Sequence, residues 1–399
     1  MAKKRILFVD DEPNILAGIR RMLRSLRKEM DMEFAESGKE ALEIMLKGPF
    51  DVVVSDMRMP GMDGAELLTE IRRLYPETMR IMLSGYAAPE AVMRTVTVVH
   101  QFLNKPCEPE DIKDTLLRCC QLRDRLTDPN LRGLITSIEA LPSLPSIYKE
   151  LLDILAHEDC SLDDVAKCIS HDISMSAKIL KLVNSPFFGL SRHVVSPIQA
   201  VNYLGLDTIK YLALSVKVFS EFEKKHTSTV SLDDLSEHSI AVGAYAKKIA
   251  ESITDNEKMT TDALIAGMMH DVGKLILISN MSEKYEKAIE LAEEEKLSME
   301  QAEQKIFKAD HCQIGAYLLG LWGFSVQVLE AIAYHHSTNE YMGTSFNPIT
   351  AVHVANVFDH ENNNRQQGGG PPTLDLDYLE RVQCQNSLED WRKLCQMET

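Results

Sequence analysis

The sequence of 399 residues has no apolar run that approaches the roughly 20 residues needed to cross a bilayer, which excludes a membrane-spanning helix. It also shows no secretion signal, because only four apolar residues, at 6–9, separate the basic start from Asp10. The eight cysteines include no Cys-x-x-Cys pair, as is typical of reduced, mostly buried thiols. These absences predict a cytoplasmic protein.

Positive charge is scarce as well. Lys and Arg number 43 against 60 Asp and Glu, so the net charge is −17. Such a chain gains little from counterion release on nucleic acid and is repelled by an anionic membrane surface. A few basic residues recur at helical spacing and indicate a solvated helix face: Arg20, Arg21, Arg24, Arg27 and Lys28. We expect no nucleic acid and no membrane among the partners.

The length suits two or three domains, and the first third alternates between strand and helix patterns. Short apolar runs predict buried parallel strands at residues 6–9, 51–54, 81–83 and 102–103, with a weaker candidate at 32–35. Amphipathic patterns between them predict helices at residues 14–30, 39–46, 65–74, 90–99 and 110–126. The alternation predicts a doubly wound, five-stranded parallel sheet of the flavodoxin-like type, which binds ligands at the carboxyl ends of its strands.

Polar residues gather at those predicted strand ends. They are Asp10 and Asp11 after the first strand, Asp56 after the third, Ser84 after the fourth and Lys105 after the fifth. One acid at a strand end is common by chance, whereas five such groups in this order are not. Converging carboxylates repel one another unless a hard cation such as Mg²⁺ binds between them. With Lys105 to pair with an anion and Ser84 to donate to a phosphoryl oxygen, the pattern predicts phosphoryl transfer to a carboxylate.

The motifs around these residues closely resemble those of response regulator receiver domains, from residue 4 to about 125. They are Val-Asp-Asp-Glu, Ser-Asp-Met-Arg-Met-Pro-Gly-Met-Asp-Gly, Leu-Ser-Gly-Tyr and Phe-Leu-Asn-Lys-Pro. The resemblance implies that a histidine kinase phosphorylates Asp56. It also implies that Asp11 and Asp56 hold Mg²⁺, with Asp10 close by and the backbone carbonyl of Arg58 as a further ligand. Ser84 and Phe102 would form the pair whose movement signals phosphorylation.

Residues 109–126 are predicted to form the last receiver helix. Its apolar stripe is explained by packing on the sheet, and a homodimer formed through this helix is the alternative. We expect a receiver domain at 1–125, a linker at 126–135 and an output domain at 136–399. The helical parts expected after the receiver lie at 131–222, 231–360 and 374–399.

From about residue 131 onward strand patterns disappear, which predicts an all-helical region. His171 with Asp172 precedes a predicted helix start and is interpreted as its cap. Residues 231–360 contain most of the twelve histidines, and the candidate metal ligands fall at or near helix ends: His238, His270, Asp271, His311, His335 and His336. Such a set suits Fe, Mn, Co or Zn. Metal-activated water could then attack a phosphate ester steadied by Lys274.

The stretch His-Asp-Val-Gly-Lys at 270–274 resembles the signature of HD-superfamily phosphohydrolases. The order of the histidines is similar to that of the HD-GYP cyclic-dinucleotide phosphodiesterases. Two features depart from this pattern. Asn356 stands where the superfamily has a metal-binding Asp, which lowers the expected metal affinity, and no Gly-Tyr-Pro motif follows His336.

Taken together, residues 131–360 are most similar to the HDOD domain, a signalling relative of HD hydrolases. The motifs that carry this similarity are Leu-Pro-Ser-Leu-Pro, Asn-Ser-Pro-Phe-Phe-Gly and Ala-Val-Asn-Tyr-Leu-Gly. We therefore expect a two-component response regulator whose phosphorylation controls an HDOD output through an unidentified partner protein. The alternative is a phosphorylation-gated, metal-dependent phosphohydrolase acting on a nucleotide or cyclic dinucleotide. A DNA-binding regulator is disfavoured, because no helix-turn-helix pattern follows the receiver.

Overall fold

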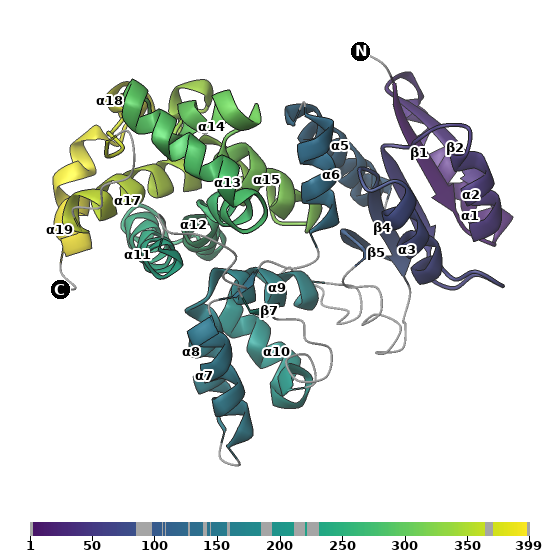
Figure 1. Cartoon of the computed structure of the whole chain (residues 1–399), viewed down its shortest axis with the longest axis horizontal. Coiled ribbons are helices and arrows are strands. Elements are labelled where there is room, and N and C mark those ends of the chain that lie inside the picture. The colour runs from purple at the N-terminus through teal and green to yellow at the C-terminus, as the bar shows by residue number, and fades with distance from the viewer. Residues whose placement is uncertain are drawn as a thin grey trace. The chain divides into compact units, whose positions relative to one another are not determined.

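The computed structural model divides the chain into two compact units, one built mainly from Met1–Glu139 and the other mainly from the residues after it. The described residues are 3–84, 98–105, 107, 109–126, 128–138, 142–143, 145–157, 160–184, 194–210, 220–221, 231–363 and 370–396. The five longer strands lie in the first unit, and helices dominate the second (Figure 1).

Parallel pairing joins the strands of the first unit into one sheet. These strands are β1 (Lys4–Val9), β2 (Met30–Ala35), β3 (Val52–Asp56), β4 (Met79–Ser84) and β5 (Gln101–Asn104). Their order across the sheet is β2-β1-β3-β4-β5. The pairing of Val9 with Ser55 and of Asp56 with Leu83 brings the carboxyl ends of β1, β3 and β4 to one edge. The predicted doubly wound, five-stranded parallel sheet is confirmed.

Helices connect these strands. They are α1 (Pro13–Met22), the 3₁₀ helix η1 (Leu23–Lys28), α2 (Gly38–Met45), α3 (Gly64–Leu74), α5 (Pro109–Arg125) and α6 (Pro129–Ser137). The helix predicted at 14–30 is wrong in its second half, because η1 replaces it. Leu23 and Leu26 are buried three residues apart, a spacing that fits the three residues per turn of a 3₁₀ helix. Residues 90–97 of another predicted helix lie outside the described residues.

Most of the predicted linker at 126–135 belongs to a helix of the first unit. The side chain of Asp128 caps α6, and Pro129 occupies its first position. The buried guanidinium of Arg80 on β4 donates to the carbonyl of Thr136 on α6 at 2.8 Å. His100 contacts the same carbonyl through Nε2 at 2.9 Å. These bonds fix α6 to the strand that leads to Ser84.

Among its described residues, the second unit is helical apart from one pairing of two-residue strands, β6 (Pro142–Ser143) with β7 (Ser220–Glu221). Its helices up to Phe307 are α7 (Pro145–Ala156), α8 (Leu162–Ser170), α9 (Ile173–Val183), α10 (Pro197–Lys210), α11 (Leu232–Glu251), α12 (Glu257–Met269), α13 (Val272–Glu295) and α14 (Met299–Phe307). The remaining ones are α15 (His311–Leu321), α16 (Val326–Tyr334), η4 (Thr338–Glu340), α17 (Pro348–Asn363), α18 (Leu376–Arg381), η5 (Gln385–Ser387) and α19 (Leu388–Gln396). Among the described residues, none of the helices combines the length and apolarity that a bilayer crossing requires.

Local sequence signals explain how several of these helices begin and pack. Asp172 accepts a bond from the backbone N–H of Met175 at 2.7 Å, which confirms its predicted role as the cap of α9. At the C-terminal end, the indole of Trp391 on α19 is buried and donates to Ser252 at the end of α11 at 2.9 Å. The last helix therefore packs back on the second unit, as predicted.

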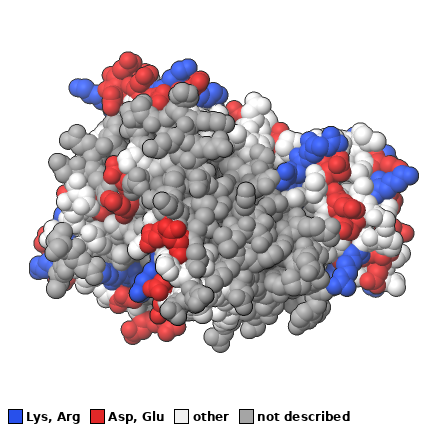
Figure 2. Space-filling view, turned by 60° about the horizontal axis from the view of Figure 1, so that its bottom comes forward, with Lys and Arg blue, Asp and Glu red and all other residues white. Residues whose placement is uncertain are grey.

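On the face shown in Figure 2, Lys and Arg side chains are interspersed with Asp and Glu. Among the residues that this view colours, no broad area of one sign stands out.

Candidate functional site

The first cluster of charged residues lies at the carboxyl edge of the sheet. Asp10 follows β1, Asp56 ends β3, and Lys105 follows β5. The ammonium of Lys105 lies 2.7 Å from one oxygen of Asp10 and forms a hydrogen-bonded ion pair with Oδ1 of Asp56. The sheet therefore brings together three of the residues that the sequence places at its strand ends.

Backbone N–H groups hold the remaining oxygens of the two carboxylates. The N–H of Arg58 donates to Oδ2 of Asp56 at 2.6 Å, and that of Glu12 donates to Oδ1 of Asp10 at 3.0 Å. Burial works to lower the pKa of Lys105, but the bonds and charges of Asp10 and Asp56 raise it above its ordinary value. Asp56 is buried with 8% of its surface exposed, and its carboxylate is fixed in place by these bonds.

A glycine allows α3 to begin directly against the end of β3. A Cβ atom on Gly64 would lie 2.0 Å from the backbone oxygen of Asp56, which no side chain tolerates. Asp63 caps the helix in a reciprocal capping box with Glu66. The Asp-Gly that ends the receiver motif thus has a structural role in setting the position of Asp56.

The other predicted receiver residues lie around this cluster. Asp11 is half-buried in the turn after β1, and the side chain of Arg58 is exposed. Phe102 is half-buried on β5, where its backbone pairs with Met82 of β4. Ser84 ends β4, and its side chain lies outside the described residues.

The second cluster contains five histidines of the second unit, and five helices contribute to it. His238 lies on α11, His270 and Asp271 join α12 to α13, and His311 starts α15. His335 and His336 directly follow α16. Potential ligand atoms lie close together in two groups, His238 with His270 and Asp271, and His311 with Cys312, His335 and His336.

Each imidazole in the cluster has one nitrogen held by an acceptor. Nδ1 contacts an acceptor at 2.6–2.8 Å in four of them: His238 with Asp359, His270 with the carbonyl of Gly267, His311 with Glu303 and His335 with the carbonyl of Ile332. In His336 it is Nε2 that contacts Glu300, at 3.0 Å. Fixing one ring nitrogen as a donor directs the lone pair of the other inward, the arrangement typical of metal-binding histidines.

The inward atoms of the cluster lie close to one another. Nε2 of His238 and Nε2 of His270 are 3.2 Å apart, and Nε2 of His311 is 3.3 Å from Oδ1 of Asp271. Neither of the last two atoms has a hydrogen-bond partner in the described part of the chain. Two imidazole nitrogens on one metal ion at about 2.1 Å are separated by roughly 3.0–3.4 Å. The spacing and the chemistry of these atoms therefore fit a bound cation.

The electrostatics of the cluster agree with this reading. Burial lowers the pKa of His270 to about 3, so its ring is neutral and can act as a ligand. Burial also holds the pKa of His335 and of His336 well below the usual value. His311 differs, because Glu303 raises its pKa against the effect of burial. Burial would raise the pKa of Asp271, but the nearby His270, Lys274, His311 and His238 hold it well below its usual range.

A second glycine, Gly273, lets the backbones of α13 and α15 approach closely, which brings the two groups of ligands together. A Cβ on Gly273 would lie 1.9 Å from the backbone oxygen of His311, so only glycine lets α13 and α15 meet here. Asp271 lies between the groups. Its Oδ2 accepts a hydrogen bond from Nζ of Lys274 at 2.8 Å, and its Oδ1 faces Nε2 of His311. The Gly of His-Asp-Val-Gly-Lys is therefore needed for the meeting of the two groups.

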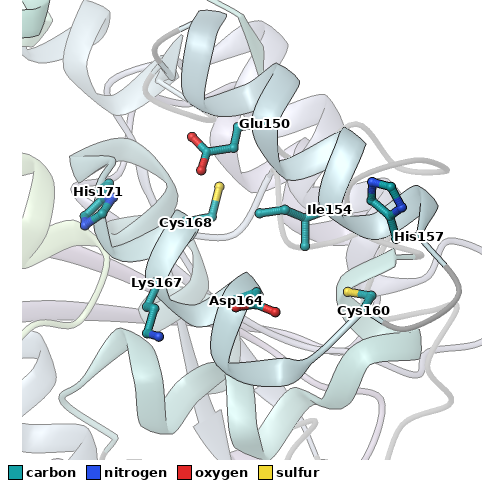
Figure 3. A pocket seen from close by; sticks show the side chains of 8 residues that line it. All are labelled: Glu150, Ile154, His157, Cys160, Asp164, Lys167, Cys168 and His171. Carbon is teal, nitrogen blue, oxygen red and sulfur yellow. The ribbon is translucent and has the colours of Figure 1, made fainter.

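A separate pocket of about 640 Å³ lies between α7 and α8. It is lined by Glu150, Ile154, His157, Cys160, Asp164, Lys167, Cys168 and His171 (Figure 3). Although its lining includes histidines and cysteines, Figure 3 shows His157 and His171 at opposite ends. Within the described residues these side chains form no compact donor group of the kind found around Asp271.

Comparison with known protein families places the two clusters in two different domains. Residues 6–117 match the family model of the response regulator receiver domain, and residues 141–338 match that of the HDOD domain. The chain is a response regulator with a receiver domain and an HDOD domain. The receiver match covers Asp10, Asp56 and Lys105, and the HDOD match covers the histidines from 238 to 336.

Individual relatives share parts of this response regulator. An uncharacterized protein of Treponema pallidum (strain Nichols) is 25% identical over 266 residues, which are 65% of this chain and 48% of that protein. The hydrogenase transcriptional regulatory protein HoxA of Cupriavidus necator is 36% identical over 117 residues, 28% of this chain and 23% of HoxA. This chain therefore spans less than half the length of either relative.

A solved structure resembles a larger part of the fold. The MmoQ response regulator from Methylococcus capsulatus str. Bath is 21% identical, with a TM-score of 0.50, and the match covers 64% of this chain and 98% of MmoQ. At this identity the likeness concerns the fold alone.

The structure also identifies residues of the HDOD domain that sequence reasoning missed. Asp359 and Glu303 are fully buried and hold His238 and His311, and Cys312 contributes a sulfur to the second group. Asn356, predicted to take the place of a metal-binding Asp, is buried on α17, and its side-chain oxygen has no partner among the described residues. The helical spacing from 356 to 359 is the signal that could have pointed to Asp359.

Proposed function

We propose that this response regulator works in the cytoplasm, where a histidine kinase phosphorylates Asp56 and the phosphorylation state controls the HDOD domain. The observation that carries this proposal is the placement of Asp56, a carboxylate held by the Arg58 N–H and paired with Lys105. Asp10 adds a second carboxylate on the same ammonium. These groups provide both a nucleophile and oxygen ligands for a hard cation.

In the proposed reaction an oxygen of Asp56 bonds to phosphorus as the P–N bond of the kinase's phosphohistidine breaks. The phosphoryl group then resides on Asp56, and the kinase histidine is left unmodified. Asp10, Asp11 and Asp56 would hold Mg²⁺ with the Arg58 carbonyl, and the ion supplies neutralisation of the phosphoryl charge. Lys105 is in place to pair with a phosphoryl oxygen instead of Asp56.

The same domain contains a route from the phosphorylation site toward the output. β4 ends at the predicted switch residue Ser84, and β5 carries its predicted partner Phe102. Arg80 on β4 and His100 just before β5 both contact Thr136 of α6. We infer that movement of the switch pair is transmitted to α6, and that the HDOD domain then binds or releases a partner protein.

The test is phosphorylation of the full chain with a small phosphodonor and Mg²⁺. We expect base-labile label on the wild-type protein and none on Asp56→Asn. Asp31→Asn is the matched control, because Asp31 is an exposed acid near the amino end of β2, away from the carboxyl edge of the sheet. Label on Asp56→Asn equal to wild type would overturn the assignment. Proteins captured by the labelled chain, but not by Asp56→Asn, would identify the output partner.

The histidine cluster favours a second candidate function, a metal-dependent phosphohydrolase. The supporting observation is the buried pair of facing nitrogens of His238 and His270 beside Asp271. A divalent metal ion there would supply Lewis acidity for the attack of water on a phosphate ester. Lys274, whose pKa Asp271 raises against the effect of burial, would be the group that steadies the phosphate.

This candidate is tested by hydrolysis assays of the metal-loaded full chain on cyclic dinucleotides and nucleotides, with and without the phosphodonor. Turnover that disappears in His270→Ala and changes with Asp56 phosphorylation would support the gated enzyme. Stoichiometric metal without turnover would leave the metal as a structural part of a signalling domain.

A further inference from the structure

The two ligand groups of the HDOD domain differ in chemistry. The group of His238, His270 and Asp271 offers two imidazoles and a carboxylate, a set that suits Fe²⁺ or Mn²⁺. The other group offers imidazoles from His311, His335 and His336 together with the thiol of Cys312. A sulfur donor shifts preference toward softer metals.

We propose that His311, Cys312, His335 and His336 form a thiolate-containing zinc site, with Cys312 as a metal ligand. This inference rests on the proposal that the histidine cluster holds metal, and it adds a ligand and a metal preference to it. The thiol proton is released to solvent when the metal–sulfur bond forms.

The distances support coordination by four ligands. All four ligand atoms lie within 4.8 Å of one another, and Sγ of Cys312 is 3.9 Å from Nε2 of His335. A tetrahedral zinc ion, with bonds of about 2.3 Å to sulfur and 2.0–2.1 Å to nitrogen, separates sulfur from nitrogen by roughly 3.6 Å. The spacing of Cys312 and His335 therefore requires only a small contraction around the ion, and the wider separations in the group, up to 4.8 Å, require a larger one.

Cys312 lies among acidic groups whose charge a cation would balance. Its thiol is 3% exposed, and burial, then the charges of Asp310, Glu300, Glu303 and Asp271, raise its pKa well above the ordinary value, so the thiol loses its proton only when a cation binds. Two of these acids also hold the imidazoles of the group, Glu303 on His311 and Glu300 on His336. Ligands that are themselves oriented by carboxylates are the usual second layer of a zinc site.

The experiment loads the full chain, stripped by a chelator, with one equivalent of Co²⁺ as a spectroscopic substitute for zinc. We expect a near-ultraviolet thiolate-to-cobalt charge-transfer band that is lost in Cys312→Ser. Cys384→Ser is the matched control, because Cys384 is also buried in the second unit but belongs to neither ligand group. We further expect zinc to bind at least about tenfold more weakly to Cys312→Ser than to the control.

X-ray absorption of wild-type protein loaded with one equivalent of zinc tests the same point without a substitution, and one sulfur neighbour at about 2.3 Å is expected. Cobalt binding without the charge-transfer band, or zinc with no sulfur neighbour, overturns the thiolate ligand and leaves metal binding by the cluster intact. Absence of any metal binding overturns both this site and the hydrolase candidate, while phosphorylation of Asp56 remains separately measurable.

Discussion

The two clusters differ in how they relieve the repulsion between acceptor atoms that lie close together. In the receiver, the carboxylates of Asp10 and Asp56 share the ammonium of Lys105, and backbone N–H groups hold their other oxygens. In the HDOD domain, His238, His270 and His311 turn their inner nitrogens toward one another or toward Asp271. Each site contains a lysine paired with an aspartate, but in the histidine cluster Oδ1 of Asp271 has no hydrogen-bond partner among the described residues.

This difference bears on how long each site keeps its ion. A side chain as flexible as Lys105 can move between carboxylate and phosphoryl partners, so the receiver tolerates the arrival and departure of Mg²⁺ and phosphate. Buried, unpartnered acceptors such as Oδ1 of Asp271 are costly to leave unsatisfied. We therefore expect transient occupation of the receiver and permanent occupation of the histidine cluster.

The largest effect on the difference between the two sites is expected from Asp271→Asn. We expect metal affinity to fall by about 100-fold or more, because the variant removes the negative charge that both ligand groups share. Elemental mass spectrometry of the dialysed full chain measures the outcome. Asp262→Asn is the control, a buried acid of α12 bonded to Ser325 and remote from the ligand groups. Full metal content in Asp271→Asn would remove the contrast between the two sites.

A smaller effect is expected from Asp359→Asn. Asp359 holds Nδ1 of His238 at 2.6 Å, and loss of such an orienting carboxylate lowers metal affinity by about 10–100-fold. Competition with a chromophoric chelator gives the affinity, with the exposed Glu361→Gln as control. Equal affinities in the two variants would show that His238 is not a ligand.

The receiver should respond in the opposite direction when its cation is removed. In Lys105→Met we expect Mg²⁺ to bind about threefold to tenfold more tightly, because the ammonium no longer competes for Asp10 and Asp56. Calorimetric titration, corrected with the signal of Asp56→Asn, measures this. Lys39→Met, an exposed residue of α2, should match wild type. Weaker binding in Lys105→Met would mean that Lys105 organises the site more than it competes there.

The smallest effect concerns the bonds that fix α6. Burial, then the charge of Arg80, lowers the pKa of His100 well below 6.5. The unfolded chain then binds a proton that the folded unit excludes, so acidification below about pH 6.5 destabilises the first unit. Between pH 7 and pH 6 the loss is under about 1 kcal/mol. Hydrogen exchange of β4 and β5, corrected for intrinsic rates, should show this loss in wild type and less in His100→Gln.

Sequence reasoning predicted what is encoded locally. The strands, the acids at their ends and the stretch His-Asp-Val-Gly-Lys are each read from a few neighbouring residues. The end of α1 was missed because pairing of β2 with β1, a tertiary constraint, replaces the last turns with η1. Glu303 lies eight residues before His311 and contacts its Nδ1 only because α14 and α15 pack together. No local sequence pattern predicts this contact.

Other features of the cluster appear only in the fold. Cys312 is a buried thiol, as expected, and its sulfur lies near the imidazoles of His311, His335 and His336. Asp359, one turn after Asn356 on α17, is the carboxylate that contacts His238. Helical periodicity relates the two positions but cannot decide between them without the neighbouring helix.

The attachment of α6 to β4 has a practical meaning for protein engineering. A receiver cut out at residue 125 would leave the buried guanidinium of Arg80 and the ring of His100 without the Thr136 carbonyl they share. Loss of such a buried acceptor costs about 1–3 kcal/mol. Grafting this receiver onto a reporter, to build a phosphorylation-responsive sensor, therefore calls for a junction after Ser137, with α6 carried along as part of the module.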